Sequence, residues 1–201
     1  GYTTWQKKVI IESGKSTEYW NVLLSKDPAN PITLPETTQT IRAFPSPKKS
    51  IVALASKHDN ELAVTTYNTK TESYAQVFSL ADADLLDVQS DGIEWSPEAE
   101  KLLIPVEHAG KHEYYVVDTA TTASFKLDFL TEDGRRKFMR WHPKERATLI
   151  YLDKQILSRV DTRETPLTPI SMYSDIVAYD ISSERAYTLS PHGIVMRYPL
   201  D

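Results

Sequence analysis

Cysteine and long apolar runs are absent from this 201-residue sequence, and acidic residues outnumber basic ones. The lack of cysteine excludes disulfides, zinc–thiolate centres and thiol nucleophiles. No stretch approaches the roughly 18 consecutive apolar residues that cross a bilayer, so we expect no direct membrane insertion by this segment. The formal net charge of −5 argues against a nucleic-acid partner, because neutralising phosphates requires clustered lysine and arginine.

The sequence does contain a repeat of short strand-like segments. In its clearest copy the segments are separated by a proline-marked turn, a glycine turn and an Asp-Thr turn, which are typical boundaries of β-strands. These segments are residues 93–97, 102–104, 113–117 and 124–127. Because Asx side chains bond the backbone two residues further on, the Asp-Thr and Asn-Thr pairs are expected at the turn before the outer strand.

Aromatic residues mark the start of each copy at nearly regular intervals. The anchors Trp5, Phe44, Trp95, Trp141 and Tyr179 are 39, 51, 46 and 38 residues apart. In the last four copies the second strand opens seven positions after the anchor. A period of about 40 to 45 residues with four short strands is typical of a β-propeller blade. We expect each anchor to fill the gap between adjacent blades.

The sequence therefore predicts an all-β fold, a single β-propeller domain of about five four-stranded blades. Stacked blades bury the two apolar faces that a lone four-stranded sheet cannot hide. A β-sandwich with coincidental spacing is the alternative. The predicted blades within the domain 1–201 cover approximately residues 1–36, 37–80, 90–130, 135–170 and 173–201. Between two of them, residues 81–87 are expected to form a short helical turn.

The sequence does not decide whether the propeller ring closes within this chain. The last copy ends at Asp201, where a fourth strand is expected, so either residues 1–5 pair there or the chain is an incomplete ring or a fragment of a larger propeller. An open arc would expose apolar faces and strand edges. The chain begins with Gly1 and not with methionine, which leaves room for a leader, an anchor or flanking domains.

Several short motifs suggest chemistry but lack the residues that the chemistry needs. Residues 13–16 resemble the tail of a phosphate-binding loop, yet the required earlier glycine is missing, so we expect a hairpin turn. His108 and His112 flank a predicted turn without further metal ligands. The aspartates of residues 82–91 lack the calcium-loop pattern. With no Gly-x-Ser-x-Gly elbow either, we expect no catalytic residue, no metal and no cofactor.

One copy resembles a known family of repeats. Residues 92–104, with Trp95-Ser96-Pro97 followed by Glu98-Ala99-Glu100-Lys101, resemble the Trp-Ser-Pro-Asp-Gly-Lys signature of Tol-system-type, WD-like propeller repeats. Glu98-Ala99 replaces the usual Asp-Gly, so the match is incomplete. The resemblance implies a TolB-like propeller and a periplasmic, extracellular or cell-envelope location, and it implies little about the ligand.

Glu94 and Arg140 are the predicted ligand-binding residues. Each stands one position before an anchor tryptophan on an expected innermost strand. There its side chain could face the propeller channel or the mouth of the channel. The alternative is that the two residues form a salt bridge between blades. We expect a non-enzymatic binding or scaffold domain that presents loops to a protein partner. The alternatives are the substrate-gating propeller of a larger prolyl-oligopeptidase-like serine peptidase, and a carbohydrate or small-ligand binder.

Overall fold

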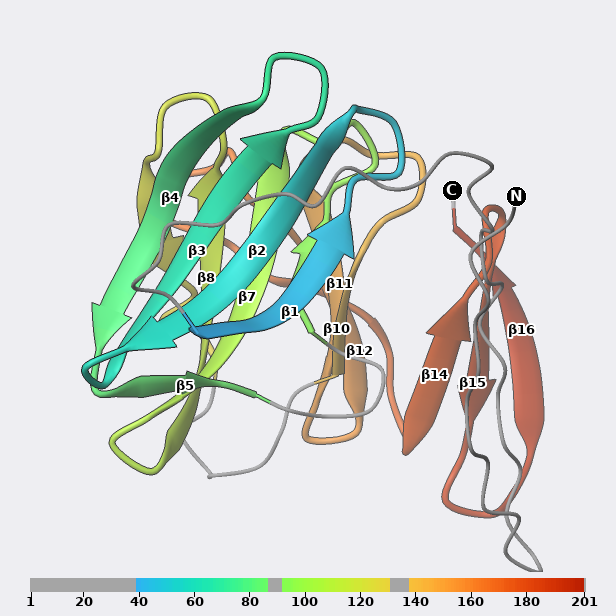
Figure 1. Ribbon diagram of the computed structural model, residues 1–201. Helices are drawn as coiled ribbons and strands as arrows, with labels where there is room; N and C mark the ends of the chain where they lie inside the picture. The colour runs from blue at the N-terminus through green and yellow to red at the C-terminus, as the bar shows by residue number, and fades with distance from the viewer. Residues whose placement is uncertain (1–38, 87–91, 131–137, 201) are drawn as a thin grey trace, which may run out of the picture. The chain divides into compact units, whose positions relative to one another are not determined.

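The computed structural model describes residues 39–86, 92–130 and 138–200, and every regular element in this part of the chain is a β-strand. Sixteen strands form four antiparallel sheets, A to D in chain order (Figure 1). The predicted all-β class is confirmed. All four sheets belong to the unit Thr37–Asp201. The predicted first blade, residues 1–36, lies outside the described residues, as does the hairpin predicted at residues 13–16.

Sheets A, C and D are simple meanders in which each strand pairs with the next one along the chain. Sheet A consists of β1 (Gln39–Pro45), β2 (Ile51–His58), β3 (Glu61–Asn68) and β4 (Ser73–Ala81). Sheet C consists of β10 (Phe138–Trp141), β11 (Thr148–Asp153), β12 (Ile156–Asp161) and β13 (Ile170–Tyr173). Sheet D consists of β14 (Ala178–Ile181), β15 (Arg185–Leu189) and β16 (Val195–Pro199).

Sheet B has the same meander and one additional strand. Its strands are β6 (Glu94–Trp95), β7 (Lys101–His108), β8 (Lys111–Asp118), β9 (Ser124–Lys126) and the additional β5 (Ala83–Leu85), which pairs with β7. The predicted helical turn is therefore wrong for these three residues. Ala83 and Leu85 are buried and Asp84 is exposed, which is the two-residue alternation of a strand with one face on the core.

Neighbouring sheets pack face to face through three hydrophobic clusters. The first cluster joins sheets A and B, the second joins B and C, and the third joins C and D. In β11 the successive residues Leu149 and Ile150 are both fully buried, Leu149 in the cluster with sheet B and Ile150 in the cluster with sheet D. Because side chains alternate along a strand, an uninterrupted apolar run is what a sheet covered on both faces requires.

Trp95 and Trp141 occupy equivalent places, as predicted for the anchors. Each ends the first strand of its meander and donates its indole Nε1–H to a carbonyl of the preceding sheet: Trp95 to Phe44 O at 2.8 Å and Trp141 to Glu94 O at 3.1 Å. Tyr179 also bridges two sheets, since its hydroxyl donates to Ile150 O at 2.9 Å. These three aromatics thus tie sheets B, C and D each to the sheet before it. Tyr179 is not equivalent to the tryptophans, however, because Ile181 is the residue that directly precedes the turn in sheet D.

Phe44 is not equivalent to the two tryptophans. The residue that directly precedes the turn is Pro45 in sheet A and Trp95 in sheet B. Phe44 therefore corresponds to Glu94, and its ring lies against Gly92, two residues before β6. The seven-residue spacing misplaces Phe44 because it takes Leu102 as the residue that opens the second strand of sheet B. β7 opens one position earlier, with Lys101, which is the counterpart of Ile51 at the start of β2.

The Asx turns are formed where the sequence predicts them, between the third and fourth strands of the meanders in sheets A, B and C. Asn68 Oδ1 accepts hydrogen bonds from the N–H groups of residues 70 and 71, and Asp118 Oδ1 accepts from those of residues 120 and 121. Asp161 Oδ1 accepts from Arg163 N at 2.9 Å. The same side-chain chemistry therefore ends the third strand in three sheets.

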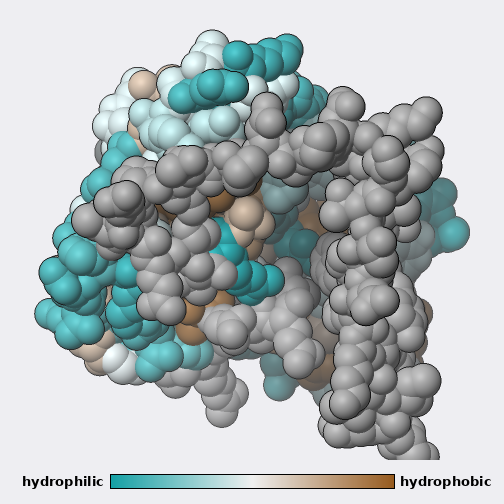
Figure 2. Space-filling view, in the orientation of Figure 1, coloured by the Kyte–Doolittle hydropathy of each residue, from teal (hydrophilic) through white to brown (hydrophobic). Residues whose placement is uncertain are grey.

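Sheet D exposes several large apolar side chains. On the face visible in Figure 2, described residues are mostly hydrophilic or neutral, and hydrophobic ones appear in small separate areas. In contrast, Val195 is 69% exposed and Tyr187 is 41% exposed, and the register places both on one face of sheet D. In the described residues sheet D pairs with no strand of sheet A, so the four described sheets form an incomplete ring. The alternative in which residues 1–5 pair with the last copy lies outside the described residues.

Candidate functional site

The turns after β1, β6, β10 and β14 share one backbone design. In each turn one residue donates its N–H to the carbonyl of the first residue of the next strand. The side chain of that residue then accepts backbone N–H groups within the turn. The residues in this position are Ser46, Ser96, His142 and Ser182. Because the turns repeat, the prolines beside three of them also occupy related places.

These turns come together around a hollow of about 390 Å³, which we call the turn hollow. Sheets A, B, C and D all contribute to its lining. The lining residues are Pro47, Lys48, Glu94, Trp95, Pro97, Arg140, Trp141, Pro143 and Ile181. The two predicted ligand-binding residues, Glu94 and Arg140, therefore line the same hollow.

Glu94 is held in place by sheet C. Its Oε1 accepts a hydrogen bond from Trp141 N at 3.3 Å, and its backbone carbonyl accepts from Trp141 Nε1. The exposed side chain of Arg140 has no ion pair with any residue in the described ranges, and so no salt bridge joins it to Glu94. The inter-blade salt bridge considered from the sequence is not formed by this pair.

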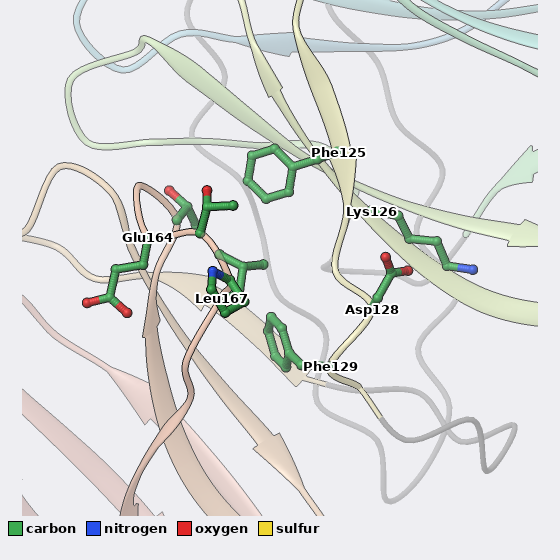
Figure 3. Close-up of a pocket in the computed structure, with 9 residues that line it drawn as sticks. Phe125, Lys126, Asp128, Phe129, Glu164 and Leu167 are labelled. Atoms are coloured by element: carbon green, nitrogen blue, oxygen red, sulfur yellow. The ribbon is translucent and has the colours of Figure 1, made fainter.

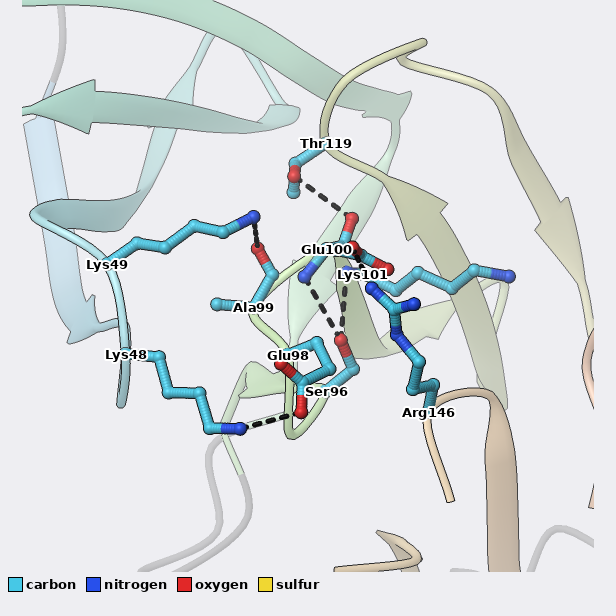
Figure 4. A network of polar contacts seen from close by, with 9 residues as sticks. All are labelled: Lys48, Lys49, Ser96, Glu98, Ala99, Glu100, Lys101, Thr119 and Arg146. Atoms are coloured by element: carbon cyan, nitrogen blue, oxygen red, sulfur yellow. Dashed lines mark hydrogen bonds and ion pairs between the residues drawn. The ribbon is translucent and has the colours of Figure 1, made fainter. Parts of the chain in front are cut away.

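Charged side chains link the turns of adjacent sheets, and one of them, Lys48, lines the hollow (Figure 4). Lys48 of sheet A pairs with Glu98 of sheet B at 2.6 Å, and Arg146 of sheet C pairs with Glu100 of sheet B at 2.6 Å. The hydrogen bond from Lys48 lowers the pKa of the Glu98 carboxyl. Lys48 is therefore neutralised, and Arg140 is left as the lining cation with no anion at ion-pairing distance in the described residues.

The geometry suits recognition of an anion flanked by apolar groups. The Arg140 guanidinium offers a planar set of donors that matches a carboxylate. Three prolines line the hollow beside it, together with the small exposed parts of Trp95 and Trp141, which are 7% and 4% exposed. Because both indoles are hydrogen-bonded to the preceding sheet, this surface is fixed before any ligand arrives.

The sequence identified only part of this site. Lys48 and Ile181 line the hollow but were not singled out, because their convergence depends on how the four sheets pack, which a single copy of the repeat does not reveal. His142 lies in the turn after β10, where it is 2% exposed and its Nε2 lies 3.1 Å from Leu200 O. The sequence feature that could have indicated this burial is that His142 directly follows the anchor Trp141.

The other predicted sites lie apart from the hollow. His108 Nδ1 is 3.3 Å from Glu113 Oε2, and His112 Nδ1 is buried without a hydrogen-bond partner in the part of the chain that the structure describes. Of the acidic residues 82–91, Asp84 pairs with Lys57, and residues 87–91 lie outside the described residues. Residues 39–86, 92–130 and 138–200 contain no group of three potential metal-ligating side chains, and no helix there is long and apolar enough to span a bilayer.

No protein-family model and no curated protein matches the sequence. Among solved structures, the chain is similar to TolB from Acinetobacter baumannii, with 15% identity and a TM-score of 0.51 over 81% of this chain and 44% of that one. It is also similar to the β-propeller domain of the Trilobed protease from Pyrococcus furiosus, which has an open velcro topology. That similarity has 14% identity and a TM-score of 0.54 over 81% of this chain and 54% of that domain. The chain thus spans about half the length of each, and its fold is that of a TolB-like, WD-like β-propeller whose described sheets form an incomplete ring.

Proposed function

We propose that this propeller is a non-enzymatic binding module that holds a protein partner at the turn hollow. The observation that carries the proposal is the convergence of four sheets on a hollow that contains Arg140 beside two tryptophans. Tryptophan and arginine are the residues that most often dominate binding energy at protein interfaces. A propeller scaffold that presents turns in this way also agrees with the exported or envelope location that we infer from the resemblance.

The partner is expected to present an acidic side chain or a terminal carboxylate next to apolar residues. Arg140 would pair with the carboxylate, while the three prolines of the lining and the small exposed parts of Trp95 and Trp141 would contact the apolar part. The hollow requires little rearrangement on binding, because both tryptophans are already hydrogen-bonded to the preceding sheet. Such preorganisation reduces the entropic cost of association.

Selection from a random peptide library on the immobilised protein tests this proposal. Peptides that contain an acidic residue should be enriched, and an Arg140→Glu variant should bind them about tenfold or more weakly, as expected for a charge-assisted pair at an interface. Arg197→Glu, which reverses an exposed charge on sheet D, is the matched control and should leave binding unchanged.

Two results would contradict the proposal. Selected peptides that bind Arg140→Glu as well as the parent protein would exclude the turn hollow as their site. Thermal stabilisation by glycans or divalent ions that depends on Arg140 would favour the carbohydrate or small-ligand alternative.

The gating propeller of a larger serine peptidase is the remaining alternative. One of the similar structures is the propeller domain of a protease. A hydrolase domain encoded next to these 201 residues in the complete gene would favour this alternative, and another binding module would favour the proposal above.

A further inference from the structure

A second concave site, which we call the outer slot, lies between sheets B and C away from the turn hollow. It has a volume of about 490 Å³ and is formed by β9, the segment after it and the connection from β12 to β13 (Figure 3). Its lining residues are Phe125, Lys126, Asp128, Phe129, Thr162, Glu164, Thr165, Pro166 and Leu167. None of them lines the turn hollow, so the two sites are independent.

The walls of the outer slot are apolar and supported from behind. Phe125, Phe129 and Leu167 are partly buried and pack against the cluster that joins sheets B and C. The ring centroid of Phe129 lies 5.2 Å from that of Tyr151, in a tilted arrangement. In Figure 3 the two phenylalanines and Leu167 face a common space. A bulky apolar side chain entering this space would therefore meet fixed apolar surfaces.

The charge of the outer slot is negative. The Lys126 ammonium pairs with Glu113 Oε1 at 2.7 Å, and Glu113 is buried, so this lysine contributes little positive charge to the slot. Asp128 and Glu164 are exposed, and neither forms an ion pair with a residue of the described ranges. Figure 3 shows the two carboxylates on opposite sides of the apolar walls. The slot is thus complementary to an apolar group that carries positive charge on either side.

We propose that the outer slot binds a short segment of a partner protein in which a bulky apolar side chain lies between lysine or arginine residues. The apolar side chain fills the space beside Phe125 and Phe129, and the flanking cations pair with Asp128 and Glu164. A peptide is a better occupant than a small molecule, because binding pockets usually enclose most of a small ligand's surface. Here four lining residues, 128 and 164–166, are themselves exposed.

Three fluorescein-labelled heptapeptides with acetylated and amidated ends serve as probes. Each has Gly-Ser at the start and Ser-Gly at the end; the central tripeptides are Lys-Phe-Lys, Glu-Phe-Glu and Lys-Ser-Lys. Fluorescence anisotropy with the full chain at low salt should show the first peptide binding about tenfold or more tightly than the other two, since one lacks the positive charges and the other the apolar side chain.

Substitutions then locate the binding. Asp128→Lys and Glu164→Lys should each weaken binding of the Lys-Phe-Lys peptide by about three- to tenfold. Glu107→Lys reverses an exposed charge on β7 outside the slot and is the matched control. Arg140→Glu should also leave binding of the Lys-Phe-Lys peptide unchanged. This variant therefore distinguishes binding at the outer slot from binding at the turn hollow.

The inference is overturned if the Glu-Phe-Glu peptide binds equally well, or if neither lysine variant weakens binding. Tryptamine, a small apolar cation, is tested as a competitor of the Lys-Phe-Lys peptide. If tryptamine displaces the peptide and binds as tightly, the outer slot is a small-molecule site and the proposal of a peptide ligand is wrong.

Discussion

His142 occupies the turn position that serine occupies in sheets A, B and D. Its Nδ1 accepts hydrogen bonds from Lys144 N at 3.2 Å and Glu145 N at 3.1 Å. Because Nδ1 accepts, the ring proton is on Nε2, which donates to Leu200 O. One imidazole therefore supports its own turn and also holds a backbone carbonyl 58 residues further along the chain.

Two substitutions separate these roles of His142. In His142→Ala two turn N–H groups and Leu200 O lose their partner, so we expect a loss of about 2–3 kcal/mol in the free energy of unfolding. His142→Ser keeps a turn acceptor, as at Ser96, and should cost only about 1 kcal/mol. Urea denaturation of both variants measures the difference. Equal losses would show that the turn acceptor is not what stabilises this position.

Asp118 makes folding stability depend on pH. The N–H of Thr121 hydrogen-bonds the Asp118 carboxylate and holds its pKa below the ordinary value of 3.8, with further support from the Thr121 hydroxyl and Ala120 N. A carboxyl with a depressed folded pKa stabilises the fold above its unfolded pKa. The contribution is lost as pH falls through the folded pKa.

Asp118→Asn should remove this pH dependence while keeping the turn. Asn68 forms the same turn in sheet A, so at pH 6 we expect the variant to unfold within about 0.5 kcal/mol of the parent. Between about pH 5 and pH 3 the variant should lose less stability than the parent, since it has no carboxyl to protonate. Denaturation at several pH values measures this, and parallel curves would contradict it.

At the scale of the element, β15 contains a buried hydroxyl that is not satisfied. Ala186 and Thr188 face sheet C, and Thr188 is 2% exposed, with no hydrogen-bond partner for its Oγ1 among the described residues. Burying a hydroxyl without a partner costs free energy, whereas a methyl group in the same place does not.

Thr188→Val should therefore stabilise the protein. We expect a gain of about 1 kcal/mol in the free energy of unfolding, and a rise of about 2–4 °C in Tm for a domain of this size. Thr188→Ser is the control, because it keeps the hydroxyl and removes the methyl group, and it should lower Tm. If the valine substitution lowered Tm instead, the Thr188 hydroxyl would have to be bonded in solution.

The elements that the sequence predicts well are those with strong local chemistry. The Asx turns depend on one side chain and the next three backbone groups, so Asp118 and Asn68 marked their turns directly. The strand Ala83–Leu85 was missed because three residues are too few for alternation to be recognised. Phe44 was aligned by ring type, whereas strand pairing fixes the register and places Pro45 opposite Val52, as Trp95 is opposite Leu102.

The candidate site was predicted in part for a related reason. Glu94 and Arg140 were found because each precedes an anchor tryptophan, and the repeat carries both to the same hollow. The outer slot was not found, since Phe125 and Leu167 are 42 positions apart and belong to different copies. Only the packing of sheet B against sheet C brings them together.

On the scale of the whole described unit, stability is expected to depend on contacts between neighbours. Each of the three hydrophobic clusters joins only two consecutive sheets. Repeat proteins built in this way behave approximately as a chain of units coupled to their nearest neighbours. Weakening one interface should therefore affect the sheets that share it more than those further along the chain.

Leu149 and Ile150 allow this to be tested, because these adjacent residues of β11 are equally buried but belong to different interfaces. Leu149→Ala and Ile150→Ala should each lower the free energy of unfolding by about 2–5 kcal/mol. Native-state hydrogen exchange should then distinguish them. Ile150→Ala should increase exchange in β15 while the amides of β2 and β3 stay protected, whereas Leu149→Ala should increase exchange in β8. If both variants increased exchange equally in all four sheets, the unit would unfold as one cooperative block, and the nearest-neighbour description would be wrong.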